Sequence, residues 1–199
     1  MTAELALELF EYCARPFLAG FGKNTCIEQV RILSEVLKRL GISTEPMACK
    51  LHVSVPSHDF QFFASGDPRD YENAKKLAHR FVSRRNRQDE ILGYHTVALV
   101  ERRIFVDLTL AQVSNEEFRF ILDPCMVSFA VTEPFDPPFF DISADATTNT
   151  GTPFTVHWIG VEDRSFEKTP AWEPSHLWKL IDMIEQGVWN EWLARRKAG

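Results

Sequence analysis

Residues 91 to 112, "ILGYHTVALVERRIFVDLTLAQ", are the stretch that most constrains the fold. They contain two apolar runs of β-forming residues separated by three charged residues at positions 101 to 103, which is the pattern of an antiparallel hairpin. With a three-residue connection, Val100 faces Ile104 and apolar side chains line both faces of the hairpin. The sequence therefore predicts a pair of strands that is buried on both sides.

Two titratable residues, His95 and Asp107, interrupt these apolar runs. A three-residue turn makes them diagonal neighbours on one face, with Cβ atoms roughly 7 Å apart, so that imidazole and carboxylate can meet, whereas a two-residue turn would separate them. An ionised Asp107 within "IFVDLTL" needs a partner that offsets its desolvation, and His95 is the nearest candidate in the sequence. The alternative is a purely structural aspartate that caps a turn or pairs with an arginine.

A cysteine stands near the start of residues 22 to 41, "GKNTCIEQVRILSEVLKRLG". The apolar spacing of this stretch predicts an amphipathic helix that ends at Gly41. Thr25 and Glu28 form a T-x-x-E pattern, which predicts a capping box and puts Cys26 at the first helical position. The partial positive charge of a helix start favours a thiolate, and its backbone N–H groups can bind an oxyanion.

The direction of the cysteine side chain leaves two interpretations open. Cys26 recurs at helical spacing with Val30, Leu33, Leu37 and Leu40, so its sulfur points to the side that packs on the protein. A core-facing cysteine is most often an inert small hydrophobe. A base on the hairpin would instead make it a nucleophile.

The rest of the chain predicts further elements around this core. Strands are expected at residues 46–55, 126–132 and 153–161, and helices at 1–18 and 173–196, the second with an apolar stripe of Leu177, Ile181, Ile184, Val188 and Trp192. Residues 56–70 indicate a long loop or short excursion near a binding surface, 71–90 a basic, solvated helix, and 133–152 a mostly irregular loop that could cover a site.

Length, charge and cysteine spacing exclude several classes of protein. The 199 residues suit a single domain spanning 1–199, and the net charge of -6 argues against a nucleic-acid binder. Charges interrupt every apolar run before the ~20 residues that a membrane span needs, so we expect a soluble, cytoplasmic protein. The cysteines and histidines form no paired metal-ligand motif, so neither a metal nor another cofactor is expected, and disulfides are not expected either. The oligomeric state is not indicated.

The order of these parts, a cysteine opening a helix followed by "YHTVALV" and "IFVDLTL" on consecutive strands, resembles the transglutaminase-like branch of the papain-like superfamily, whose layout the arylamine N-acetyltransferases share. The sequence is also similar to small uncharacterised bacterial and phage proteins. The resemblance covers residues 22 to 112 and implies an α+β fold with a central helix, opened by the cysteine, packed on an antiparallel sheet. It also implies a Cys-His-Asp triad, which falls on Cys26, His95 and Asp107.

This triad predicts an enzyme that forms a thioester on Cys26 and passes the acyl group to water or an amine, with His95 as base and Asp107 as the group that orients the imidazole. Substrates would be a peptide, a protein side-chain amide or a small acyl donor. The Cys26 backbone N–H is the best oxyanion donor, and Asn24 or Gln112 could add a side-chain amide.

Aromatic residues could line the cleft of such an enzyme, and a role in the core is an equal alternative for each of them: Tyr94, Phe60, Phe62 and Trp158. Two other hypotheses stay open. One is a catalytically inactive binding module that holds a peptide or protein partner on its phenylalanine-rich loops. The other keeps the enzyme but makes His157, on the strand "FTVHWIGV", the base.

Overall fold

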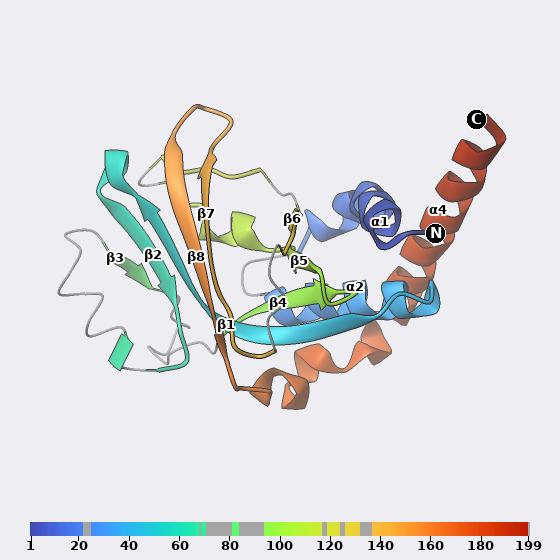
Figure 1. Ribbon diagram of the computed structural model, residues 1–199, viewed down its shortest axis with the longest axis horizontal. Helices are drawn as coiled ribbons and strands as arrows, with labels where there is room; N and C mark the ends of the chain where they lie inside the picture. The colour runs from blue at the N-terminus through green and yellow to red at the C-terminus, as the bar shows by residue number, and fades with distance from the viewer. Residues whose placement is uncertain are drawn as a thin grey trace.

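The computed structural model shows an α+β fold in which helices pack against a curled, mostly antiparallel sheet (Figure 1). It describes residues 1–21, 25–67, 69–70, 81–83, 94–116, 119–123, 126–131 and 137–198. The helices are α1 (Ala3–Leu18), α2 (Cys26–Arg39) and α4 (Trp178–Ala198). The strands are β1 (Thr44–Val55), β2 (Phe60–Ala64), β3 (Phe81–Ser83), β4 (His95–Val100), β5 (Ile104–Asp107), β6 (Val127–Ala130), β7 (Asp141–Thr147) and β8 (Pro153–Val161).

Strand β1 is the centre of the sheet because it is paired along both edges. Its residues 48–54 pair with β8, while β4 and β2 share the opposite edge, β4 along residues 44–49 and β2 along 51–55. Strands β5 and β6 extend the sheet beyond β4, and β7 continues it beyond β8. The pairing of β2 with β3 is the parallel one among the described strands. In Figure 1 the helices gather around the end with β4 and β5, and β2, β7 and β8 stand at the other end.

The predicted hairpin is confirmed in its register. Strands β4 and β5 pair Leu99 with Phe105 and Val100 with Ile104 across a three-residue turn at positions 101–103. Two residues of that turn, Glu101 and Arg102, have positive φ. The Glu101 carboxylate accepts a hydrogen bond from the backbone N–H of Ser43, the residue before β1. The odd loop length therefore puts His95 and Asp107 on the same face, as the sequence predicts.

Both faces of the hairpin are buried, also as predicted. One face joins an apolar cluster with the three helices through Ala98, Val100, Ile104, Val106 and Leu108. The other face joins a cluster with β1, β2 and β8 through Val97, Leu99 and Phe105. The hairpin thus lies between two cores, and any polar side chain in it must find its partners inside the protein.

The helices predicted at residues 1–18, 22–41 and 173–196 are confirmed by α1, α2 and α4. Helix α2 is followed by Gly41 with φ 76°, and the next N–H, of Ile42, reaches back to the Leu37 carbonyl at 2.9 Å, which is the hydrogen bond of a glycine-capped helix end. The stripe of the last helix is buried through Leu177, Ile181, Ile184 and Val188, with Trp192 packed at its edge. None of the helices within the described residues is long and apolar enough to cross a membrane.

Three predictions about the connecting segments are wrong. Residues 56–70 contain strand β2, because the alternating Phe60, Phe62 and Ala64 pack into the core despite the flanking prolines and glycine. Residues 133–152 contain strand β7, whose small residues pair with β8 along its whole length. Residues 81–83, within the predicted basic helix, form β3; the rest of that helix lies outside the described residues.

Candidate active site

The centre of the site is a buried histidine–aspartate pair. His95 Nε2 and Asp107 Oδ2 are 2.8 Å apart, and their side chains are 2% and 0% exposed. Strand β4 begins at His95 and β5 ends at Asp107, so the pair lies at the end of the hairpin away from its turn. The register of the strands, set by apolar burial and the three-residue turn, brings the two side chains together.

Asp107 also accepts hydrogen bonds from two other residues, Thr109 and Trp158. The Thr109 backbone N–H donates to Oδ1 at 2.8 Å, and the Trp158 indole N–H donates to Oδ2 at 2.9 Å. A carboxylate with no exposure to water needs such donors to remain ionised, because they replace the hydration that it loses. Asp107 is therefore held in one orientation, with Oδ2 toward His95.

The pKa values of the pair move in opposite directions. Burial works against a protonated His95, but the charge and hydrogen bond of Asp107 outweigh it and raise the pKa of His95 to about 9. Burial also works against an ionised Asp107, but the charge and hydrogen bonds of its neighbours lower its pKa below the ordinary value. At neutral pH the pair is an imidazolium and a carboxylate.

The second nitrogen of His95, Nδ1, is the one left for an interaction with the cysteine. Nδ1 is buried, and among the described residues it has no hydrogen-bond partner of regular geometry. The Cys26 thiol nevertheless interacts with the imidazole by hydrogen bonding and by charge, and both effects raise the pKa of His95. Since Nε2 is committed to Asp107, this interaction runs through Nδ1. The three predicted residues are therefore together, with His95 in the middle.

Cys26 is the first residue of α2, as predicted, but the predicted capping box is wrong. Within the described part of the chain, the Thr25 side chain makes no cap hydrogen bond to the backbone of the helix. Its hydroxyl oxygen instead accepts hydrogen bonds from the side-chain amides of Gln29 at 3.0 Å and Gln112 at 2.9 Å. The T-x-x-E pattern failed because a partner distant in sequence, Gln112, competes for the same oxygen.

The proposed oxyanion donors fall in different places. The side chain of Gln112 reaches the start of α2, where its amide donates a hydrogen bond to the hydroxyl of Thr25, the residue just before Cys26. Asn24 lies outside the described residues. The backbone N–H of Cys26 belongs to the first helical turn, so its acceptor cannot come from within the helix.

The predicted cleft residues are distributed over the core and the surface. Trp158 is 1% exposed and donates to Asp107, and Phe60 is equally buried, with its ring 5.6 Å from that of Phe120. Tyr94 is partly exposed, and its ring packs closely over Gly66, where there is no room for a Cβ atom. Trp158 is thus part of the triad's surroundings, a role that the sequence analysis missed.

His157, the alternative base, is on the outer side of β8. Its Nε2 pairs with Asp141 of β7, and their side chains are 33% and 73% exposed. Because neighbouring residues of a strand point to opposite faces, the inward Trp158 requires His157 to point away from the triad. The geometry favours His95 as the base.

A second buried thiol lies beside the triad. Cys49 of β1 is the register partner of His95 and is fully buried. Burial, together with the charges of Asp107 and Cys26, raises its pKa well above the ordinary value. Cys49 is therefore a neutral neighbour that keeps water away from the imidazole. The described cysteines Cys13, Cys26 and Cys49 are not joined in disulfides.

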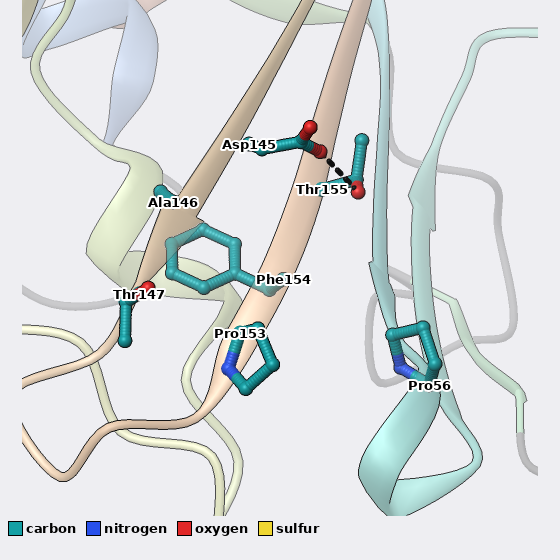
Figure 2. Close-up of a pocket in the computed structure, with 7 residues that line it drawn as sticks. All are labelled: Pro56, Asp145, Ala146, Thr147, Pro153, Phe154 and Thr155. Carbon is teal, nitrogen blue, oxygen red and sulfur yellow. Dashed lines mark hydrogen bonds between the residues drawn. The ribbon is translucent and has the colours of Figure 1, made fainter.

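A separate hollow of about 420 Å³ lies at the far end of the sheet (Figure 2). The β7–β8 hairpin and the turn after β1 form it, and its lining is Pro56, Asp145, Ala146, Thr147, Pro153, Phe154 and Thr155. Figure 2 shows Pro56 across from the hairpin, on which Asp145 accepts a hydrogen bond from Thr155 at 2.7 Å. None of the triad residues lines this hollow.

The comparisons with known proteins add no relatives: no family model matches the sequence, no curated protein matches it, and no solved structure matches its fold. Within the described residues, no group of three or more His, Cys, Asp or Glu side chains could hold a metal ion. A thiol beside an imidazolium that is fixed by a carboxylate is a set able to perform nucleophilic acyl transfer.

Proposed function

We propose that the protein is a cysteine-dependent acyl-transfer enzyme, with Cys26 as nucleophile, His95 as general base and acid, and Asp107 as the residue that orients the imidazole. The observation that carries this proposal is the fully buried His95–Asp107 pair, with the Cys26 thiol close enough to raise the pKa of the imidazole. Keeping an ion pair in the core is costly unless every partner is in place. A purely structural pair would have no need of a cysteine at a helix start beside it.

The fold supports the same proposal. A helix that begins with the cysteine, followed by antiparallel strands that carry the histidine and the aspartate in this order, is the arrangement that the transglutaminase-like branch of the papain-like superfamily implies. We propose membership of this group on that basis. Because a fold alone does not determine a reaction, the proposed activity depends on the triad.

In the first half-reaction, the Cys26 thiolate attacks the carbonyl carbon of an amide or ester and forms a C–S bond. The carbonyl oxygen takes up the electron pair and is stabilised by the Cys26 backbone N–H at the helix start. When the intermediate collapses, the bond to the leaving group breaks, and the leaving group takes the proton from His95 Nδ1. A thioester and a neutral imidazole remain.

In the second half-reaction, water or an amine attacks the thioester while His95 Nδ1 accepts its proton. The C–S bond then breaks, which releases the acyl product and restores the thiolate and the imidazolium. Hydrolysis, deamidation and transamidation share the first half and differ only in this acceptor. The substrate class is a peptide, a protein side-chain amide or a small acyl donor, and a reducing compartment such as the cytoplasm suits a thiol nucleophile.

The proposal is tested by trapping the thioester with an activated ester. After incubation with p-nitrophenyl acetate, peptide mapping by mass spectrometry should locate an acetyl group on Cys26 that hydroxylamine removes. Cys26→Ser is the matched control, because the buried Cys49 and the partly buried Cys13 remain available in it. Acetylation only of cysteines other than Cys26, which are Cys13, Cys49 and Cys125, or of no cysteine, would reject the proposal.

The low exposure of Cys26, at 4%, favours a second candidate function, a binding module on the same fold. In that case the thiol is a small core residue, and the buried pair fixes the sheet for a partner that binds elsewhere. This candidate expects no acetylation of Cys26 in the folded protein. The trapping experiment therefore decides between the two.

A further inference from the structure

We infer that Trp158 is a positioning residue of the triad: its indole N–H, together with the Thr109 backbone, fixes the Asp107 carboxylate so that His95 keeps its hydrogen on Nε2 and turns Nδ1 toward Cys26. The inference rests on the proposed function and extends the site to strand β8. It assigns the second half of the chain a part in the chemistry.

The geometry at Oδ2 is the first argument. His95 Nε2 at 2.8 Å and the Trp158 indole at 2.9 Å share this one oxygen, while Oδ1 accepts from Thr109. An indole N–H is only ever a donor and does not titrate in the pH range of the protein. Trp158 therefore occupies the remaining acceptor capacity of Oδ2 without competing for a proton. Of the groups that donate to this oxygen, only His95 can exchange its proton.

The placement of the indole is the second argument. Trp158 is paired on both sides, with Leu51 of β1 and Ile142 of β7, so its backbone cannot shift independently of the sheet. Its ring packs edge-on against Phe105 at 5.3 Å and tilted against Phe129 at 6.0 Å. The carboxylate of Asp107, on β5, is thus held by His95 from β4 and by Trp158 from β8, which lies on the opposite edge of β1.

The tautomer of His95 is the consequence. A carboxylate free to rotate could take the imidazole proton on either of its oxygens or turn away from the ring. A fixed Oδ2 holds the hydrogen on Nε2 and aligns the ring, so Nδ1 is left as the nitrogen that exchanges a proton with sulfur and substrate. The titratable groups that face Asp107 are His95 from β4, Cys49 from β1 and, beyond the imidazole, Cys26 from α2.

A buried tryptophan also needs a hydrogen-bond partner for its own sake, so the test must read the carboxylate and not stability. In the Cys26→Ala background, the Asp107 side-chain carboxyl and the His95 nitrogens are titrated by NMR, with and without Trp158→Phe. We expect the acid-side midpoint of Asp107 to move up by about one pH unit without the indole, because one hydrogen bond to the ionised form is lost. The Nε2–H signal of His95 should broaden.

Phe105→Leu is the matched control, since it removes a ring that packs on Trp158 but keeps the indole N–H. It should destabilise the fold and leave both titrations unchanged. If Trp158→Phe does not fold, the indole cross-peak of Trp158 in the folded parent protein serves instead, and it should shift with the Asp107 midpoint. Unchanged titrations in Trp158→Phe, or an indole signal that does not follow Asp107, would overturn the inference.

The outcome is independent of the proposed activity, because these titrations need no reactive thiol. If Cys26 cannot be acetylated but the Asp107 midpoint moves as expected, the acyl-transfer proposal fails and Trp158 still positions the pair. If Cys26 is acetylated but the midpoint does not move, the enzyme stands and Trp158 is only a core residue.

Discussion

The part of the chain that the structure describes contains two histidine–aspartate pairs on adjoining parts of one sheet, and they differ in burial and in the groups around them. His95 and Asp107 are 2% and 0% exposed, whereas His157 and Asp141 are 33% and 73% exposed. The buried pair has an indole, a backbone N–H and a thiol around it, and it raises the pKa of its histidine to about 9. Burial and additional partners, not the presence of the two residue types, distinguish a candidate catalytic pair from a surface pair.

The largest expected effect comes from removing each histidine. His95→Ala should lower the rate of Cys26 acetylation by about 10³-fold or more, because the base and the counter-charge of the thiolate are both lost. His157→Ala should leave the rate within about twofold. Stopped-flow release of p-nitrophenolate measures both. Equal losses in the two variants, or a larger loss in His157→Ala, would remove the distinction between the pairs.

The aspartates provide the next comparison. Asp107→Asn keeps the shape of the side chain but presents an amide to His95, so we expect a loss of about 10² to 10⁴-fold in the same rate. Asp141→Asn is its matched control on the surface and should have no measurable effect. Thermal unfolding of both variants shows whether the first loss is one of activity in a folded protein.

The pH dependence of stability tests the buried pair without any assay of activity. Since the pKa of His95 is raised from 6.5 to about 9, its stabilising effect is complete below pH 6.5 and is lost as the pH rises through 9. The lowered pKa of Asp107 acts in the other sense, with stabilisation that is lost as the pH falls below 3.8 and through the folded value.

Urea unfolding of the parent protein and of His95→Gln measures this effect. The advantage of the parent in unfolding free energy should shrink by on the order of 2 to 3 kcal/mol between pH 6.5 and 9.5. A constant difference between the parent and His95→Gln would mean that the imidazole does not titrate on unfolding.

The smallest expected effect concerns the placement of the Cys26 thiol; the surface pair of His157 and Asp141 has no corresponding thiol among its described partners. Gln112→Met removes one of the two amides that bind Thr25, and we expect the acetylation rate to fall by roughly 3- to 10-fold through a less well placed helix start. Gln29→Met, which removes the other amide, is the comparison. A loss of about 10²-fold or more in Gln112→Met alone would instead assign its amide to the oxyanion.

Local patterns in the sequence were enough for the hairpin and for its polar pair. Alternating apolar residues and the charged turn fixed the register, and this register places His95 beside Asp107. The hydrogen bond from Thr109 to Asp107 could also have been predicted, because an aspartate side chain often accepts the backbone N–H two residues later. These features depend on neighbours within about a dozen positions along the chain.

Features that depend on distant segments could not be predicted from the sequence. The Trp158 indole reaches Asp107 from 51 positions away, and the Gln112 amide reaches Thr25 from 87 positions away. Both contacts depend on the pairing of β8 with β1 and on the packing of α2, which no local pattern specifies. For the same reason strand β7 was missed, since its small residues become a strand only through β8.

The central claim is that the buried pair activates Cys26, and the rate of its alkylation by iodoacetamide between pH 5 and 9 tests this most directly. In the folded parent protein, mass spectrometry should show Cys26 reacting well below the ~8.5 pKa of an ordinary thiol, because the imidazolium stabilises the thiolate. His95→Ala should abolish this reaction at low pH, and Asp107→Asn should weaken it. If Cys26 stays unlabelled until the protein unfolds, or if all three proteins react alike, the cysteine is a core residue and the acyl-transfer account is wrong.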